Sequence, residues 1–378
     1  MCVSVKIVRS IHEFSQHDWD RCYPGEPEGW AFYEACERAG PPDFDWLYAA
    51  AFKADRLIAA VPAFTTVYRL DTTVQGTWKR ITNRLYQIAP AAMSVRMLGL
   101  GSPVAEICHL GFAPEIAEEE KPYVLTHLIE ALQGFATEHR YCLFAVKDAP
   151  RANRDLWNGA LMPNGFTRLP GLPTAVLDLN YENFDAYLAS LSRATRKDMR
   201  RKMKAFDKVR VEQRHSIDDI AEQIWALYEE TVSHSDLQFE HLPLEYFPEI
   251  LRSLAPAASV ILYWVDDKLI AFNFVIETEK RLIDKYIGMK YALALQYSIY
   301  FNSWLWNIKY CISKNMNTYQ SGQAFYSSKL RLGSRLQPTF QYFRHNNTMI
   351  NICLRQIAKL VRVDKFDPAV AALVREAS

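Results

Sequence analysis

Cysteine is scarce in this chain and follows no metal-binding or disulfide pattern. The 378 residues include 7 cysteines, an odd number with no Cys-x-x-Cys pair, which argues against a disulfide framework and a zinc site. No cysteine shares a motif with a histidine and no Gly-x-Ser-x-Gly elbow is present, so no covalent nucleophile is indicated. The N-terminus also lacks a secretory pattern. We therefore expect a cytoplasmic chain with no metal site and no bound cofactor.

Net charge and long apolar runs are missing as well. The chain has 44 basic and 43 acidic residues, a formal net charge of +1, so any contact with nucleic acid or membrane must come from a local patch. The most apolar stretch, residues 291–312, is interrupted by Gln296, Asn302, Asn307 and Lys309, well short of the ~20 apolar residues that a bilayer span needs. We expect a buried helix there and no integral membrane segment.

What the chain does contain is an internal repeat. Residues 54–64 recur in outline as residues 266–276, and in each copy an acidic–basic dipeptide stands between two runs of strand-forming residues. This pattern predicts a tight hairpin. Each copy is followed by a helix, a strand, a second helix and a closing strand, and a chain of this length exceeds the size of one core. The sequence therefore predicts one unit built twice.

The two units predict an α/β fold. We expect each to be a mixed, mostly antiparallel sheet flanked by helices, in residues 1–180 and residues 181–346, with a helical tail in residues 347–378. A strand at residues 175–179 is expected to close the first unit, and a strand at residues 339–344 to complete the second.

The sharpest local signal is a row of cations on the long helix predicted from residue 184 to about residue 207. Six of them fall on one helical face: Arg193, Arg196, Lys197, Arg200, Arg201 and Lys204. Like charges so aligned repel, and a polyanion opposite would explain them. That polyanion could be the phosphates of a nucleotide, nucleic acid or lipid headgroup. Acidic residues of this same chain, or a solvated face, are the alternatives.

A second signal is the stretch of residues 319–333, where a strand ending in Ser321 and Gly322 leads into a helix. Backbone N–H groups at such a turn suit an anion or a developing oxyanion. The candidate binding residues here are Ser321, Gln323, Lys329 and Arg331. The alternative is a turn that needs Gly322 for its geometry and Tyr326 for packing.

The chain resembles the Fem-like (FemAB, peptidoglycan-biosynthesis-type) acyltransferases of the GCN5-related N-acetyltransferase (GNAT) superfamily. The matching stretches are residues 30–35, 57–64, 191–201 and 319–333, whose order and spacing cover nearly the whole chain. The resemblance implies two tandem GNAT-like domains with a reactive groove on or between them. It also implies transfer of an acyl or aminoacyl group to a small amine, from acyl-CoA, aminoacyl-tRNA or acyl carrier protein.

One departure concerns the donor. An acetyl-CoA enzyme of the superfamily usually has a glycine-rich turn whose amides hold the pyrophosphate. The corresponding residues 287–293 contain a single glycine, Gly288, which puts CoA in doubt and leaves the other donors open.

Direct attack by an amine requires a base, an oxyanion stabiliser and a proton for the leaving group. The candidate bases are Asp284 and Glu240, with His234 and His241 behind them. Strand alternation predicts Asp284 and Tyr286 on one face and Lys285, a further candidate for substrate binding, on the other.

Tyr319 and Tyr326 are the candidates to protonate the leaving group, because the superfamily often places a tyrosine on the helix after the strand that lines the groove. Two other functions stay open: a non-catalytic protein that binds tRNA or anionic lipid, and a thioesterase-like or carrier-dependent enzyme.

Overall fold

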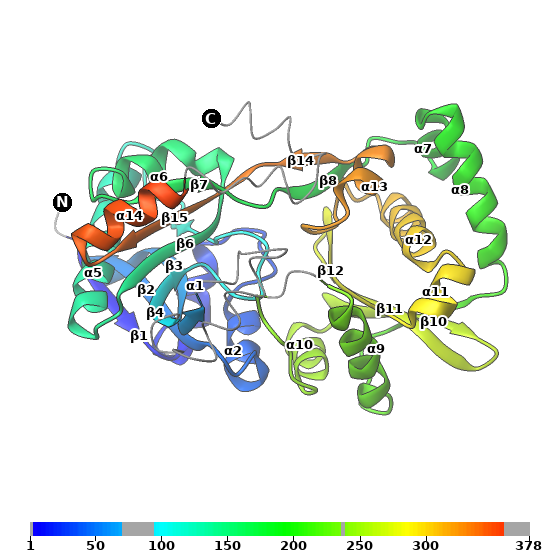
Figure 1. Ribbon diagram of the computed structural model, residues 1–378, viewed down its shortest axis with the longest axis horizontal. Helices are drawn as coiled ribbons and strands as arrows, with labels where there is room; N and C mark the ends of the chain where they lie inside the picture. The colour runs from blue at the N-terminus through cyan, green and yellow to red at the C-terminus, as the bar shows by residue number, and fades with distance from the viewer. Residues whose placement is uncertain (1–2, 70–93, 236–238, 359–378) are drawn as a thin grey trace.

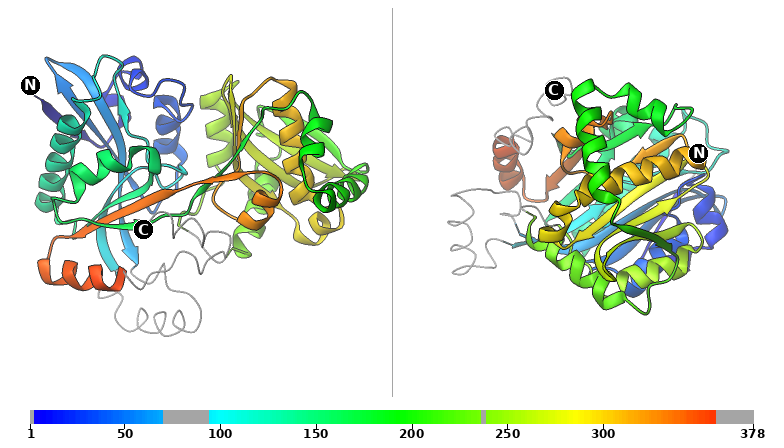
Figure 2. Two further views of the ribbon diagram at one scale, coloured as in Figure 1. Left: turned by 90° about the horizontal axis from the view of Figure 1, so that it is seen from above. Right: turned by 90° about the vertical axis from the view of Figure 1, so that its right-hand side faces the viewer.

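The computed structural model describes residues 3–69, 94–235 and 239–358. Two lobes lie side by side, each built on one sheet, and a strand connection passes from one lobe to the other (Figures 1 and 2). This confirms the predicted α/β fold with two mixed sheets flanked by helices.

The first sheet has the strand order β1-β2-β3-β4-β6-β15-β7, with the short β5 paired to β3. Its strands are β1 (Ser4–Val8), β2 (Asp45–Lys53), β3 (Arg56–Arg69), β4 (Ser94–Leu100), β5 (Gly111–Phe112), β6 (Leu143–Pro150), β7 (Thr167–Pro170) and β15 (Thr339–His345). The helices of this lobe are α1 (Gln16–Arg21), α2 (Trp30–Ala39), α5 (Lys121–Glu138), α6 (Arg154–Leu161) and α14 (Thr348–Ala358). Helix α5 packs on β1 and β2, while α1 lies against β3.

The second sheet has the order β9-β10-β11-β12-β13-β8-β14. Its strands are β8 (Thr174–Asp178), β9 (Arg210–Arg214), β10 (Ala258–Val265), β11 (Lys268–Glu277), β12 (Arg281–Met289), β13 (Thr318–Gln320) and β14 (Arg335–Gln337). Its helices are α7 (Phe184–Ser190), α8 (Arg193–Phe206), α9 (Ala221–Ser233), α10 (Tyr246–Leu254), α11 (Tyr291–Gln296), α12 (Ile299–Ser313) and α13 (Tyr326–Arg331).

The two sheets repeat the same topology position by position. In both, three antiparallel pairings lead to one parallel pair, β4 with β6 in the first sheet and β12 with β13 in the second. The two predicted hairpins turn alike, with positive φ at Ala54 and Asp55 and again at Asp266 and Asp267, as a two-residue turn between twisted strands requires. The predicted duplication is confirmed.

Each lobe gives one strand to the other. β8 pairs with β13 and β14 of the second sheet, and β15 pairs with β6 and β7 of the first. The predictions that residues 175–179 close the first unit and residues 339–344 complete the second are therefore wrong. Local alternation identifies a strand but carries no information about which sheet it joins. A division of the sequence at residue 180 does not separate the two sheets.

Two helices predicted as continuous are broken. The stretch from residue 184 divides into α7 and α8, and the Ser192 hydroxyl caps α8 by accepting from the Thr195 N–H at 3.2 Å, as an N-cap serine does. The stretch from residue 291 divides into α11 and α12 at Ser298, which has a left-handed φ of 50°. None of the helices in the described ranges is both long and apolar enough to cross a bilayer.

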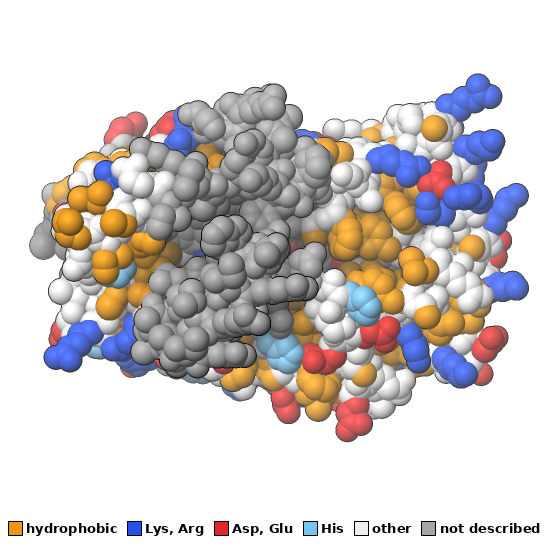
Figure 3. Space-filling view, viewed as in Figure 1, with side chains coloured by type: hydrophobic (Ala, Val, Ile, Leu, Met, Phe, Trp, Pro, Cys, Tyr) orange, Lys and Arg blue, Asp and Glu red, His pale blue; other side chains and the backbone are white. Residues whose placement is uncertain are grey.

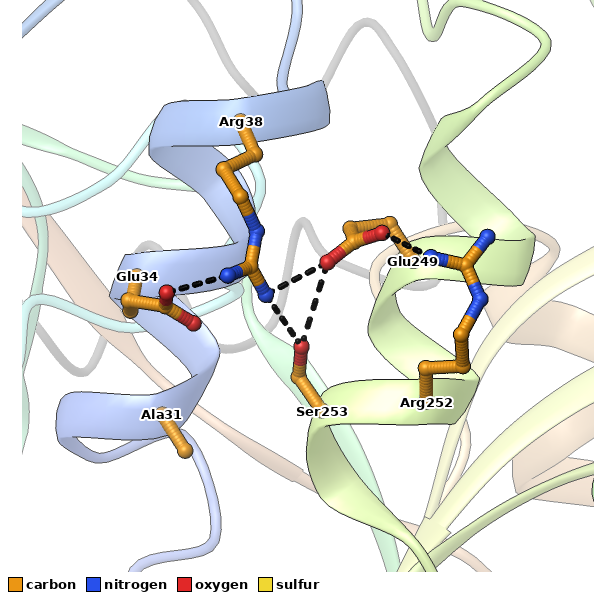
Figure 4. Close-up of a pocket in the computed structure, with 6 residues that line it drawn as sticks. All are labelled: Ala31, Glu34, Arg38, Glu249, Arg252 and Ser253. Carbon is orange, nitrogen blue, oxygen red and sulfur yellow. Dashed lines mark hydrogen bonds and ion pairs between the residues drawn. The ribbon is translucent and has the colours of Figure 1, made fainter.

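The lobes share a core. One cluster of buried apolar residues contains first-lobe side chains such as Phe32 and second-lobe side chains such as Phe247 and Phe272. Helices α2 and α10 pack against each other where the two lobes meet. There Arg38 lies between Glu34 of its own helix and Glu249 of α10, 2.5 Å from a Glu249 oxygen (Figure 4). The predicted helical tail is described only as far as α14; the rest of it lies outside the described residues.

Candidate functional site

The parallel strands β12 and β13 separate after a short contact, and Asp284 lies where they part. The two strands pair only from Arg281 to Ile283, opposite Thr318 to Gln320, so Asp284 is the first β12 residue beyond the pairing. Its backbone lies beyond the ladder with β13, and its side chain projects from one face of the sheet, where Asn307 of α12 donates a hydrogen bond to it.

Three donors surround the Asp284 carboxylate. Tyr319 Oη donates to one oxygen at 2.7 Å and Asn307 donates to the same oxygen at 3.1 Å, while Asn273 donates to the other oxygen at 2.9 Å. Burial raises the pKa of Asp284, and the hydrogen bonds from Tyr319 and Asn273 oppose that rise. Tyr319 is fully buried, whereas Asp284 keeps some accessible surface. The three hydrogen bonds thus hold the carboxylate in one orientation.

A β-bulge at Lys285 changes which way the neighbouring side chains face. Asp284 is opposite Val275 and Tyr286 is opposite Phe274, so Lys285 is the extra residue. A bulge interrupts the alternation of a strand, and Tyr286 therefore packs on the opposite side of the sheet, against Phe247. The prediction that Asp284 and Tyr286 share a face is wrong for this reason.

Lys329 of α13 is buried beside the same point. It is 6% exposed, and its ammonium donates to the carbonyl oxygen of Ser321. Burial lowers the pKa of Lys329 to about 8, although the carboxylates of Glu106 and Asp284 act in the opposite direction. A cation held at this place in a low-dielectric surrounding interacts strongly with any negative charge that develops nearby.

Gly322 is needed where the chain leaves β13. Its φ is +79°, and a Cβ atom there would lie 3.0 Å from a carboxylate oxygen of Glu106 and 3.8 Å from the Lys329 ammonium. Glu106 reaches this place from the first lobe and accepts a hydrogen bond from Gln320 at 2.6 Å. Burial raises the pKa of Glu106, and Lys285 opposes the rise.

The other candidates of this stretch have structural contacts. The Ser321 N–H donates to the carbonyl oxygen of Ala175 at 2.9 Å, so this N–H group is engaged in a backbone hydrogen bond with β8. Gln323 donates to the carbonyl oxygens of Glu106 and Leu172 at 3.0 and 2.9 Å. Tyr326 is buried on α13, a helix of only six residues.

Helix α8 presents its cations to solvent along the outer edge of the second lobe (Figures 1 and 3). Not all six are available. Arg196 donates to the carbonyl oxygens of Ala189 and Leu191, and Arg201 pairs with Asp198 at 2.8 Å. Of the six cations, four are exposed and have no ion-pair partner among the described residues: Arg193, Lys197, Arg200 and Lys204. They still fall at i, i+4, i+7 and i+11, on one face.

Arg331 joins this helix to α13. Its guanidinium lies 2.6 Å from Asp198 and 3.3 Å from the Thr195 hydroxyl. The Lys202 and Arg331 contacts lower the pKa of Asp198 to about 2. Arg331, expected to bind substrate, thus links the cationic helix to the helix that carries Lys329.

Lys285 links the two lobes through its side chain. Its ammonium pairs with Glu28 and donates to the Val104 carbonyl oxygen at 2.7 Å, and its side chain is 2% exposed. Although burial alone would lower the pKa of Lys285, the carboxylates of Glu28 and Glu106 raise it. No surface of the side chain is left for a substrate.

The remaining candidate bases have other neighbours. Burial raises the pKa of Glu240, while Lys147 lowers it. His234 is exposed, stacks on Tyr291 and bonds to the Glu230 carbonyl oxygen at 2.7 Å. His241 pairs with Glu229 at 2.6 Å near the surface.

Sequence reasoning missed three polar residues of this place: Asn273, Glu106 and Asn307. Asn307 had a visible signal, because it interrupts the apolar face of a predicted buried helix. Asn273 has one too, as a polar residue within an otherwise apolar strand. Glu106 lies in an irregular segment and has no local signal.

Comparison with known proteins assigns the chain to a family. Residues 116–363 match the FemAB-like family of peptidoglycan biosynthesis/recognition, about two thirds of the chain. The chain belongs to the FemAB-like family. No curated protein sequence is significantly similar to it.

Solved structures support the same fold for this FemAB-like protein. FemX superposes with a TM-score of 0.61 at 10% identity, over 93% of this chain and all of FemX. A tandem GNAT protein from the clavulanic acid biosynthesis pathway gives 0.51 at 10% identity, over 91% and 99%. L-PGS from Bacillus licheniformis gives 0.50 at 11% identity, over 88% and 97%. At these identities the likeness establishes the fold, two tandem GNAT domains, and no more.

The turn after β12 differs from a pyrophosphate-binding turn. The Tyr291 N–H donates to a carboxylate oxygen of Glu230 at 2.9 Å, and the Met289 N–H donates to the Thr231 hydroxyl at 2.9 Å. Gly288 serves close packing, since a Cβ there would lie 2.2 Å from the ring of Phe272. Side chains of α9 thus use backbone donors that a phosphate would need.

Proposed function

We propose that this FemAB-like protein is an N-acyltransferase that moves an acyl or aminoacyl group from an activated donor to an amine by direct attack. The observation that carries the proposal is the arrangement of Asp284, Tyr319 and Lys329 where β12 and β13 separate. It supplies an oriented carboxylate and a buried cation at one place, between strands of an acyltransferase fold.

The reaction needs three things from these residues. The amine nitrogen attacks the donor carbonyl carbon, and its proton passes to Asp284, whose raised pKa suits a proton acceptor. Tyr319 fixes the carboxylate through its 2.7 Å hydrogen bond. The Lys329 ammonium has three donors, of which the Ser321 carbonyl takes one, and the positive charge stabilises the oxyanion of the tetrahedral intermediate.

The leaving group carries the phosphates in every donor considered. We propose that Arg193, Lys197, Arg200 and Lys204 of α8 hold them, because guanidinium and ammonium groups bind phosphate well. The Arg331–Asp198 contact supports this, since it connects the cationic face to α13. Tyr326 of α13 is retained as the candidate donor of a proton to the leaving oxygen or sulfur.

The donor we favour is aminoacyl-tRNA or an acyl carrier protein rather than acyl-CoA. A carboxylate at the strand-to-helix turn repels a pyrophosphate and already satisfies the N–H group that would bind it. Glu230 occupies that position.

Native mass spectrometry of the purified protein with CoA, acyl-CoA, acyl carrier protein and a charged tRNA pool tests the proposal. We expect an adduct with the tRNA or the carrier and none with CoA. Replacing the four exposed α8 cations by alanine should abolish that adduct. A matched control removes four exposed lysines elsewhere in the second lobe, Lys268, Lys280, Lys309 and Lys314, and should leave it intact. Equal binding by both variants would reject the phosphate-binding role of α8.

A non-catalytic tRNA- or lipid-binding protein is the second candidate, favoured by the exposed α8 cations alone. Such a protein would bind with steep salt dependence and would release no deacylated tRNA or thiol when an amine is added. Turnover that depends on the amine would reject it.

A further inference from the structure

A histidine and two glutamates meet at the boundary between the lobes, outside the residues used above. Glu26 and Glu28 lie between α1 and α2, and His109 lies shortly before β5. The Nε2 atom of His109 is 3.5 Å from an oxygen of Glu28 and 3.9 Å from an oxygen of Glu26. One ligand atom from each residue lies within 4.8 Å of the other two.

The His109 ring is oriented and has an unused nitrogen. Nδ1 lies 2.9 Å from Tyr33 Oη, while Nε2 is buried and has no hydrogen-bond partner. The side chain is 4% exposed. A buried imidazole nitrogen normally bonds to something, and a metal-binding histidine typically has its other nitrogen fixed by a hydrogen bond, as Tyr33 provides here.

The two glutamates each divide their oxygens between a cation and the histidine. One Glu28 oxygen pairs with Lys285 and one Glu26 oxygen pairs with Arg281 at 2.9 Å. The other oxygen of each faces His109. Glu106 adds a third carboxylate close to Lys285 and Lys329.

We propose that Glu26, Glu28 and His109 bind a divalent transition-metal ion, zinc or manganese, at the boundary between the lobes. Two carboxylate oxygens and one imidazole nitrogen suit such an ion. With metal–ligand distances of about 2.0–2.2 Å, ligand atoms of a tetrahedral site lie about 3.3–3.6 Å apart. The separations from His109 Nε2 are 3.5 and 3.9 Å, and the Glu26 and Glu28 ligand atoms lie within 4.8 Å of each other, so binding would draw the two carboxylates closer together.

The ion has a route in and a structural role. The side chains of Glu26 and Arg281 are 16% and 25% exposed, so the site opens to solvent on that side. Its ligands belong to the first lobe, and through Lys285 and Arg281 they contact β12 of the second. The metal would fix the carboxylates that these cations need and so stabilise the contact between lobes. This role is independent of the proposed transfer reaction.

Isothermal titration of chelator-treated full-length protein, separately with Zn²⁺ and Mn²⁺, tests the site. We expect one equivalent of one or both ions to bind the wild type and His109→Gln to lose that binding. His241→Gln is the matched control, because His241 and Glu229 form a similar pair near the surface; it should bind as the wild type does. No binding by the wild type, or unchanged binding by His109→Gln, would overturn the proposal.

A measurement on the wild type guards against misfolding of the variant. Co²⁺ added to metal-free wild type should give a visible ligand-field absorption that one equivalent of Zn²⁺ removes, and the melting temperature should rise with metal concentration. Circular dichroism of His109→Gln should match that of the wild type. A Co²⁺ spectrum that persists in folded His109→Gln would place the ion elsewhere and overturn the proposal.

Discussion

The buried Lys329 should make the stability of this protein depend on pH in a defined way. Burial shifts its pKa from the ordinary 10.5 to about 8, so between these values the unfolded chain holds a proton that the folded chain has released. Stability therefore rises with pH over this window. Each pKa unit corresponds to about 1.4 kcal/mol, so keeping Lys329 charged below pH 8 costs the folded state about 3 kcal/mol.

The variant Lys329→Met removes the titrating group with little change in length. Between pH 7 and pH 9 the wild type should gain about 1.4 kcal/mol in free energy of unfolding from this residue, and Lys329→Met should gain none. Thiols that titrate in the same range affect both proteins equally and cancel in the difference.

Urea unfolding followed by tryptophan fluorescence at several pH values measures the difference, and equal m-values establish that the same unfolding is compared. Lys309→Met, which removes an exposed lysine of α12, should keep the pH slope of the wild type. If Lys329→Met and the wild type change in parallel from pH 7 to pH 9, Lys329 is not held as described, and its assignment as an electrostatic group fails.

Further predictions concern catalysis and the contact between lobes. Asp284→Asn should lower kcat by at least ~100-fold with little change in KM, because it removes the proton acceptor; a smaller loss would reassign the base. The rate of acyl transfer by the wild type should decline as pH rises through about 8, where Lys329 loses its charge. Lys329→Arg should lack this decline because arginine stays charged. The same decline in the variant would mean that another group titrates. Lys285→Met should lower the free energy of unfolding in urea by about 3–5 kcal/mol, since Glu28 is left buried without its partner. The double variant Lys285→Met with Glu28→Gln should recover part of that loss. No recovery would mean that the two side chains are not coupled. Gly322→Ala should destabilise the folded protein by about 1–3 kcal/mol because of its positive φ and the nearby Glu106. Gly134→Ala, in α5 with open space around it, should instead stabilise the folded protein by about 0.5–1 kcal/mol. Equal effects of the two substitutions would mean that Gly322 is not required at its position.

Local patterns in the sequence predicted much of this fold. The hairpins at residues 54–64 and 266–276 were predicted because their turn chemistry and flanking strands are contiguous. The cationic face of α8 was predicted because helical spacing is a local property. Asp284 and Tyr319 were proposed separately as catalytic residues, and the structure places them in direct contact.

Contacts between distant residues could not be predicted in this way. The exchange of β8 and β15 depends on pairing partners far along the chain. The bulge at Lys285 arises from the register between β11 and β12, which alternation within β12 alone does not contain. Glu28 and Glu106 meet β12 and β13 only because the two lobes pack together. Irregular segments of the first lobe therefore supply charges that no motif in the second lobe implies.

The proposed reaction is transfer of an acyl group to an amine, with Asp284 as the proton acceptor where the pairing of β12 and β13 ends. The most direct measurement is the rate at which free tRNA or free carrier thiol is released from the charged donor, with and without an added amine pool, for the wild type and for folded Asp284→Asn. Release should require both the amine and the Asp284 carboxylate. Release that is the same without amine, or the same in Asp284→Asn, would contradict it.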